Sequence, residues 1–207
     1  MNKKTKNRIL LVEGNDDKHV ILALCEKFNL PETFDIIDCK GIDKLLEQIH
    51  VRFLQSEIEV IGIVIDADSD IKNRWKTLKA ILILQGFDLP NKLPLNGLVV
   101  SNKNNIKIGV WIMPNNQLDG MLENFISFLI PQDDKLLPIV HSTLDAIENQ
   151  KLNKYSLKHK PKAIIHSWLS WQENPGTPMG LGITKRYLTT DEKTCNTFID
   201  WLTRLFT

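Results

Sequence analysis

The sequence predicts an α/β protein: a mostly parallel sheet with helices on both faces and a helical appendage at the C-terminal end. Three observations support this fold class. In the first half of the chain, short apolar runs alternate with segments whose apolar residues recur at helical spacing. Residues 60–65 are almost continuously apolar, as expected of a central strand buried on both faces. The second half shows helical periodicity without further strands, which indicates the appendage.

The first half of the chain follows a β-α-β order. Three strands are predicted, at residues 8–12, 34–39 and 60–65. Each is followed by a predicted helix, at residues 18–28, 41–54 and 71–84 respectively. Two more strands are expected at residues 95–100 and 106–113. The polar stretch SNKNN between these two predicts a hairpin, which makes one strand antiparallel to the rest.

The second half is expected to be helical. Helices are predicted at residues 118–129, 135–149, 163–171 and 194–206. A loop rich in proline and glycine separates the last two, with the sequence QENPGTPMGLGITKRYL. We expect residues 1–130 to form the α/β core and residues 131–207 to form a helical extension packed on it.

Composition narrows the class of function. The 207 residues carry a net charge of about +1, so nucleic acid would have to bind through a local patch or through metal ions. The three cysteines form no C-x-x-C pair, which argues against a zinc ribbon and favours a reducing cytoplasm. The basic start, MNKKTKNR, is expected to be a solvated lead-in to the first strand rather than a signal or membrane segment.

Acidic residues follow two of the predicted strands. Glu13 ends the apolar run in LLVEGNDD, and Asp66 and Asp68 end the run in IVIDAD. Because the carboxyl ends of parallel strands meet at the edge where open α/β sheets bind ligands, we expect these three side chains to converge. Adjacent carboxylates repel one another unless a cation neutralises them. Oxygen-only ligands favour a hard ion, so the sequence predicts a Mg²⁺ site, with Mn²⁺ as a substitute.

Helix capping is the alternative role for the neighbouring carboxylates. Asp16 and Asp70 stand at helix starts, where aspartate commonly caps the helix or supplies a first-turn charge, and we expect that role for both. Asp17 is open to either role, as a cap or as a further metal ligand. Farther on, Asp119 and Glu123 lie four residues apart on one helix face. Either could supply a carboxylate to a second metal ion, with Glu123 preferred, or both could form an exposed acidic face.

The two acidic motifs resemble those of the TOPRIM domain, in which an apolar strand ends in Glu-Gly with a nearby aspartate and a later strand ends in Asp-x-Asp. The resemblance covers roughly the first 115 residues and implies a TOPRIM or Rossmann-like fold, with Glu13, Asp66 and Asp68 as catalytic metal ligands. The whole chain also looks like a group of uncharacterised bacterial TOPRIM-like proteins. Topoisomerase, primase and recombination-mediator branches need domains or cysteines absent here. Of the TOPRIM branches considered, the metal-dependent nuclease of the OLD (overcoming lysogenisation defect) type remains.

Lysines in the stretch KYSLKHKPK are candidates for contacts to nucleic acid. Lys158, Lys160 and Lys162 would form a strip that binds the phosphate backbone, with DNA favoured over RNA. OLD-type nucleases use a lysine near the metals, and we assign that catalytic role to Lys162, which enters the following helix at an apolar junction. The alternative is a solvated linker.

Three functions therefore compete. The favoured one is a Mg²⁺-dependent nuclease or related phosphoryl-transfer enzyme, with a place in phage defence. OLD-type nucleases often depend on an ATPase, and because the chain lacks G-x-x-x-x-G-K-[ST], a separate ATPase partner fits. The second is a non-catalytic TOPRIM module that binds a partner protein. The third, a receiver-like phosphoacceptor, is disfavoured because IGVWIMP brings no lysine to the end of its strand.

Overall fold

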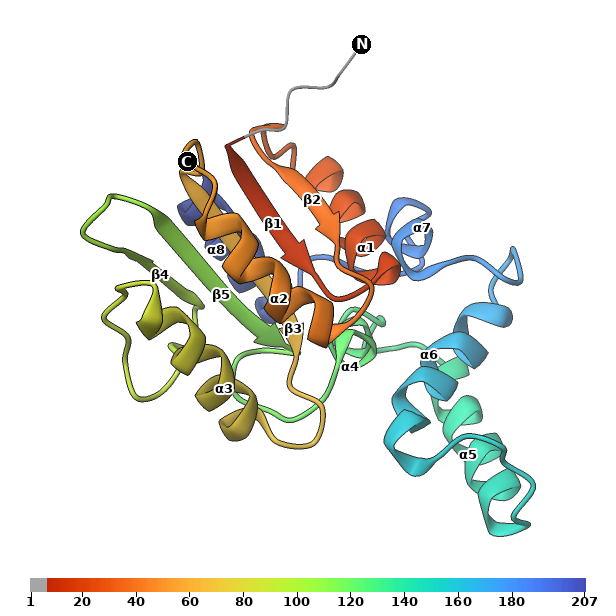
Figure 1. The fold of residues 1–207 in the computed structure, drawn as a ribbon. Helices are drawn as coiled ribbons and strands as arrows, with labels where there is room; N and C mark the ends of the chain where they lie inside the picture. The colour runs from red at the N-terminus through yellow and green to blue at the C-terminus, as the bar shows by residue number, and fades with distance from the viewer. Residues whose placement is uncertain (1–6) are drawn as a thin grey trace.

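A computed structural model describes residues 7–207, so the lysines of the basic start at positions 3, 4 and 6 lie outside the described residues. Its centre is a five-stranded sheet with the strand order β2-β1-β3-β5-β4 (Figure 1). The strands are β1 (Arg8–Val12), β2 (Asp35–Asp38), β3 (Val60–Asp66), β4 (Leu98–Ser101) and β5 (Lys107–Met113). Four strands are parallel and β4 is antiparallel to β5, which confirms the predicted hairpin and the mostly parallel α/β class.

Helices connect the strands and make up the rest of the chain. They are α1 (Asn15–Lys27), α2 (Ile42–Phe53), α3 (Ile71–Leu84), α4 (Leu122–Phe128), α5 (Leu136–Asn149), α6 (Lys160–Ser170), α7 (Met179–Thr184) and α8 (Lys193–Phe206), with a short 3₁₀ helix, η1 (Leu157–His159), before α6. None of the helices in the described part of the chain combines the length and apolar character that a bilayer crossing requires.

The alternation of side chains along the strands builds two apolar cores, one on each face of the sheet. Leu10 and Trp111 face a core shared with α1, α4 and the helices of the second half, and Leu11 and Ile63 face a core shared with α2 and α3. Figure 1 shows α2 and α3 in front of the sheet and α1 and α8 behind it. Both faces of the central strands are therefore buried, as their continuous apolar sequence predicts.

Helix α8 is part of the sheet's own core. Gly62 of β3 and Gly109 of β5 are paired neighbours, and a Cβ atom at either position would lie about 2.5 Å from a side-chain carbon. The missing side chains make room for Leu205 of α8, which packs on both glycines. Trp201 of the same helix is fully buried and its ring lies 5.8 Å from that of Trp111. Helices α5 and α6, in contrast, project away from the sheet (Figure 1).

Candidate functional site

Glu13 and Asp66 meet at the carboxyl edge of the sheet, where the neighbouring strands β1 and β3 end. The Oε1 atom of Glu13 accepts a hydrogen bond from the backbone N–H of Asp66 at 2.8 Å. The Oδ1 atom of Asp66 accepts one from the backbone N–H of Leu122, at the start of α4, at 3.0 Å. The two side chains are thus held by backbone groups of two segments, the end of β3 and the start of α4, so the site joins parts of the chain that lie far apart in sequence.

Asp17 combines the two roles that the sequence leaves open. Its Oδ2 atom accepts a hydrogen bond from the backbone N–H of Gly14 at 3.1 Å and so caps α1. The side chain is only 7% exposed, and its Oδ1 atom is buried without a hydrogen-bond partner. A buried oxygen of this kind is costly to leave unpaired, so capping alone does not account for the whole carboxylate.

Glu123 comes from the first turn of α4 and is the most deeply buried acid of the group, at 3% exposed. Its charge raises the pKa of Asp17 and of Asp66, so it belongs to the same electrostatic neighbourhood. The Nζ atom of Lys162 lies 3.6 Å from its Oε1 atom. The structure therefore brings together five sequence candidates, which we call the acidic edge: Glu13, Asp17, Asp66, Asp68 and Glu123.

Burial and mutual repulsion make the acidic edge hard to ionise. Desolvation raises the pKa of Glu13, of Asp17 to about 7, and of Asp66 well above its usual range. The charge of Glu13 raises the pKa of Asp17 further, and the charges of Asp17, Glu13 and Glu123 do the same for Asp66. At neutral pH, protons or a nearby cation must compensate part of this negative charge.

Asp68 sits at the rim of the acidic edge in a left-handed turn, with φ of 56°. Its backbone exchanges two hydrogen bonds with Gly120, at 2.8 and 2.7 Å, and so ties the loop after β3 to the loop before α4. Both carboxylate oxygens are ion-paired, Oδ2 with Arg74 at 2.7 Å and Oδ1 with Lys158 at 3.1 Å. Arg74, near the start of α3, is a site residue that the sequence did not suggest, because the sequence alone does not show which acid it pairs with.

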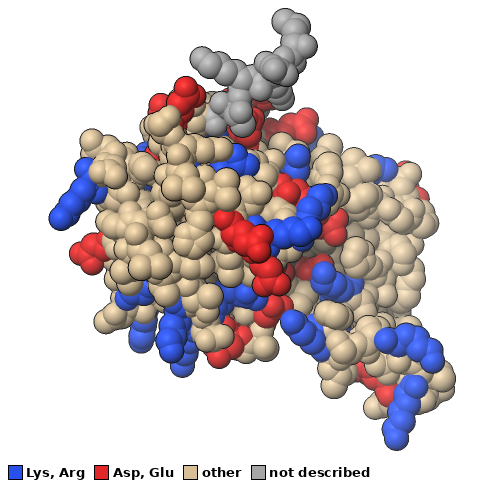
Figure 2. Space-filling view, in the orientation of Figure 1, with Lys and Arg blue, Asp and Glu red and all other residues tan. Residues whose placement is uncertain are grey.

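The three candidate lysines divide between two places. Lys158 and Lys162 reach the acidic edge, beside Asp68 and Glu123 respectively. Lys160 instead pairs with two acids of α5, Asp145 Oδ1 at 2.8 Å and Glu148 Oε2 at 2.7 Å. The structure therefore does not align the three in one strip. On the face presented in Figure 2, basic and acidic side chains are interspersed rather than separated into one basic surface.

The remaining acidic candidates serve helix starts. Asp70 is the N-cap of α3, where its side chain accepts from the N–H of Asn73 at 2.9 Å, as predicted. Asp119 accepts from the backbone N–H of Ile71 at 2.8 Å and thereby supports the same helix. Asp16 is an exposed first-turn charge on α1.

The acidic edge fits a hard divalent cation by its chemistry. All of its donors are carboxylate oxygens, the kind that Mg²⁺ prefers, and the unpartnered Oδ1 of Asp17 offers a buried oxygen. Within residues 7–207, however, no group of three or more His, Cys, Asp or Glu side chains is already arranged to hold an ion. Side-chain rotation would have to complete a ligand set, since lysine and arginine now occupy the oxygens at the rim.

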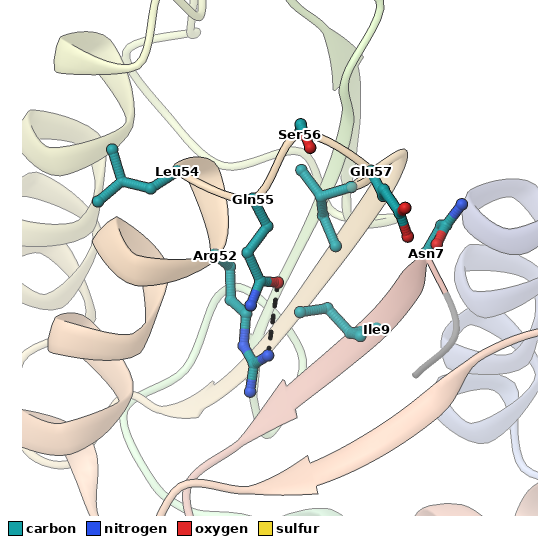
Figure 3. Close-up of a pocket in the computed structure, with 8 residues that line it drawn as sticks. Asn7, Ile9, Arg52, Leu54, Gln55, Ser56 and Glu57 are labelled. Atoms are coloured by element: carbon teal, nitrogen blue, oxygen red, sulfur yellow. Dashed lines mark hydrogen bonds between the residues drawn. The ribbon is translucent and has the colours of Figure 1, made fainter. Parts of the chain in front are cut away.

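A hollow at the opposite end of the sheet is separate from this site. It is lined by Asn7, Ile9, Arg52, Leu54, Gln55, Ser56, Glu57 and Ile58. Figure 3 shows Arg52 and Gln55 side by side on its wall, joined by a hydrogen bond of 3.5 Å. Because it lies where β1 and β3 begin, this hollow faces away from the edge at which α/β sheets bind their ligands.

Comparison with known proteins identifies a family without a known activity. A family model described as "Protein of unknown function (DUF3226)" matches residues 7–207. No curated protein and no solved structure matches the chain.

Proposed function

The chain belongs to the DUF3226 family, whose function is unknown, and for this member we propose a TOPRIM-like, Mg²⁺-dependent nuclease or related phosphoryl-transfer enzyme. The observation that carries the proposal is the acidic edge, where buried carboxylates with raised pKa values crowd the carboxyl end of a parallel sheet. Repulsion on this scale is relieved when a divalent cation binds. Mn²⁺ is the expected substitute.

Each residue has a role in this proposal. Glu13, Asp17, Asp66 and Glu123 would hold the ion, and Asp68 would complete the set from the rim. A bound divalent ion supplies charge neutralisation at the phosphorus that is attacked. Lys162, beside Glu123, would place its ammonium near the phosphate oxygens. Arg74 would orient Asp68 through its 2.7 Å ion pair.

Nucleic acid is the substrate class that the rim favours, and we propose DNA ahead of RNA. Lys158 and Lys162 have half-exposed side chains beside the acidic edge, so they can contact a phosphate backbone locally even though the protein as a whole is not strongly basic. Three free cysteines fit a cytoplasmic location. From the resemblance to OLD-type nucleases we also propose that the protein acts in phage defence together with a separate ATPase.

A non-catalytic binding module is the second candidate. The ion pairs of Asp68 with Arg74 and Lys158 favour it, because they satisfy both oxygens of a predicted ligand without any metal. Such a module would use its surface to engage a partner protein rather than to cleave nucleic acid.

Cleavage by the purified chain distinguishes the two candidates. The chain is incubated with single- and double-stranded DNA and with RNA, in Mn²⁺ and in chelator, alongside Glu13→Gln, Asp66→Asn and Asp16→Asn. A nuclease gives Mn²⁺-dependent products in the wild type and Asp16→Asn but not in the other two. Equal trace cleavage by all four proteins would identify a contaminant and leave the binding module as the function.

A further inference from the structure

The two cations on Asp68 differ in how firmly they are held. Arg74 lies on α3 with a side chain that is 18% exposed, and it binds Oδ2 at 2.7 Å. Lys158 lies in η1 with a side chain that is 52% exposed, and it binds Oδ1 at 3.1 Å. A guanidinium in a partly buried pair is a well-fixed partner, whereas an exposed ammonium on a flexible stem is easily exchanged.

We infer that Lys158 is an exchangeable counter-ion: its ammonium neutralises Asp68 Oδ1 until a divalent cation takes that oxygen, and the released lysine then binds a phosphate of the incoming nucleic acid. This inference rests on the proposed function and adds a coupling between metal and substrate to it. In the structure, the candidate metal ligand Asp68 and the candidate phosphate ligand Lys158 form an ion pair with each other.

The surroundings of Asp68 explain why it needs a counter-ion. Its charge raises the pKa of Glu13, so an unpaired Asp68 would add repulsion to an already crowded edge. Arg74 neutralises one oxygen and fixes the plane of the carboxylate. The other oxygen is paired with Lys158 at 3.1 Å, and a divalent ion that binds this oxygen would repel the ammonium beside it.

A second lysine, Lys162, is also paired with an acid of the acidic edge. Lys162 follows Lys158 by four positions, and its ammonium approaches Glu123 in the same way, at 3.6 Å. Both lysines thus cover acids that the proposed function assigns to the metal. If ions displace them, two cations become available at the same rim for backbone phosphates.

Competition of this kind predicts coupled binding of the metal and the nucleic acid. Metal ions alone must first displace Lys158, whereas a nucleic acid that accepts the freed lysine favours the displaced state. By linkage, each ligand then raises the affinity of the other by the same factor.

Mn²⁺ binding to the full chain tests the first half of the inference. Free Mn²⁺ is followed by electron paramagnetic resonance during titration of the wild type, Lys158→Met and Lys154→Met. Lys154→Met is the matched control, because Lys154 is exposed and, unlike Lys158, forms no ion pair with the acidic edge in the described part of the chain. Removing the competitor should tighten Mn²⁺ binding by about two- to fivefold in Lys158→Met, the range of exposed ion pairs. Lys154→Met should match the wild type.

The outcomes separate this inference from the proposed function. No Mn²⁺ binding by any of the three proteins overturns the metal site itself. Binding by the wild type that is unchanged or weakened in Lys158→Met overturns the counter-ion role and leaves the metal site standing. Thermal unfolding of each variant establishes that it is folded before it is titrated.

Oligonucleotide binding tests the second half. The affinity of a fluorescent single-stranded DNA oligonucleotide is measured by anisotropy with and without Ca²⁺, which also takes oxygen ligands. Ca²⁺ should raise the affinity of the wild type and of Lys154→Met by the same factor and should raise that of Lys158→Met less. An equal enhancement in all three proteins would show that Lys158 does not pass from Asp68 to a phosphate.

Discussion

Glu13 and Asp66 are joined across two strands by a hydrogen bond of 2.8 Å, in which a carboxylate oxygen of Glu13 accepts the backbone N–H of Asp66, 53 positions along the chain. The bond fixes the direction of the Glu13 side chain at the carboxyl edge. The charge of Glu13 also raises the pKa of the neighbouring Asp17 carboxyl.

Divalent ions should stabilise the folded chain through Glu13. A ligand bound only by the native state raises the melting temperature with its concentration, so millimolar Mg²⁺ or Mn²⁺ should shift the wild-type transition upward by several degrees. Glu13→Gln keeps an oxygen to accept the Asp66 N–H but removes a charge, and it should abolish the shift. Asp16→Asn should keep it, since asparagine serves a helix start equally well. Identical shifts in all three proteins would place the ion elsewhere.

Stability should fall with rising pH because of Asp17. Its pKa rises from 3.8 to about 7 in the folded state, so the native protein binds the extra proton between those values. The free energy of unfolding therefore decreases as the pH rises through that window and levels off above it. Asp17→Asn should flatten this dependence and add roughly 1 to 4 kcal/mol at pH 8 without divalent ions, from about 1.4 kcal/mol per pKa unit.

Urea unfolding at pH 5 and at pH 8, in chelator, measures that difference. Asp16→Asn is the matched control and should keep the wild-type profile, because its side chain is exposed. If the difference in unfolding free energy between the wild type and Asp17→Asn is the same at pH 5 and at pH 8, the raised pKa of Asp17 is contradicted.

The salt dependence of DNA binding should distinguish the lysines. Each lysine that contacts a phosphate contributes about 0.7 for single strands or about 0.9 for duplex to the slope of log K against log salt. Lys158→Met combined with Lys162→Met should reduce the slope by about twice that amount. Lys160→Met should leave it unchanged, since Asp145 and Glu148 hold that side chain on α5. A larger loss in Lys160→Met than in the double variant would reverse our assignment.

Helix α8 should prove essential to the sheet. Trp201 is fully buried, packs on Trp111 and donates from its indole N–H to the carbonyl of Leu98 at 2.9 Å. Trp201→Ala should cost about 3 to 5 kcal/mol, the range for large-to-small changes in a core. Trp201→Phe keeps much of the volume and should cost less. Chemical denaturation followed by circular dichroism measures both, and a cost for Trp201→Ala under 1 kcal/mol would mean that α8 is only loosely attached.

Apolar periodicity was sufficient to predict most of the fold. The bounds of β1 and α3 agree with prediction, because each is delimited by polar residues on both sides. Helix α7 was not predicted, since Gly180 and Gly182 disfavour a helix in isolation. Gly180 is there because the backbone of α1 lies against it: a Cβ would be 2.6 Å from the carbonyl oxygen of His19. Such a tertiary requirement leaves no periodic signal.

The start of α4 shows a related limit. Prediction began this helix at residue 118, whereas it begins at Leu122, because Gly120 is engaged in backbone hydrogen bonds with Asp68. The pairing joins two loops that are distant in sequence. The local sequence around residue 118 carries no sign of this pairing, so it could not show that the helix begins only at Leu122.

The site was predictable to the extent that strand ends determine it. Glu13 and Asp66 follow apolar runs, and parallel topology brings such positions to one edge. The ion-pair partners of the three lysines in KYSLKHKPK were not predictable. These lysines lie at the junction of η1 and α6, and the middle one faces a different side of the chain from the other two. Lys160 faces α5 while Lys158 and Lys162 face the acidic edge. Charge alone does not reveal that division.

Because Leu205 of α8 packs on Gly62 and Gly109, the part of the sheet around these glycines stays uncovered until the ribosome has translated α8. During that interval the emerging strands expose apolar side chains, the kind of surface that favours aggregation and engages chaperones. Contacts between residues so distant along the chain also form slowly. The carboxyl edge likewise depends on residues translated after its strands, since Lys158 pairs with Asp68 and Lys162 with Glu123. A nascent chain stalled before these lysines would carry the acids of β1 and β3 without their cations.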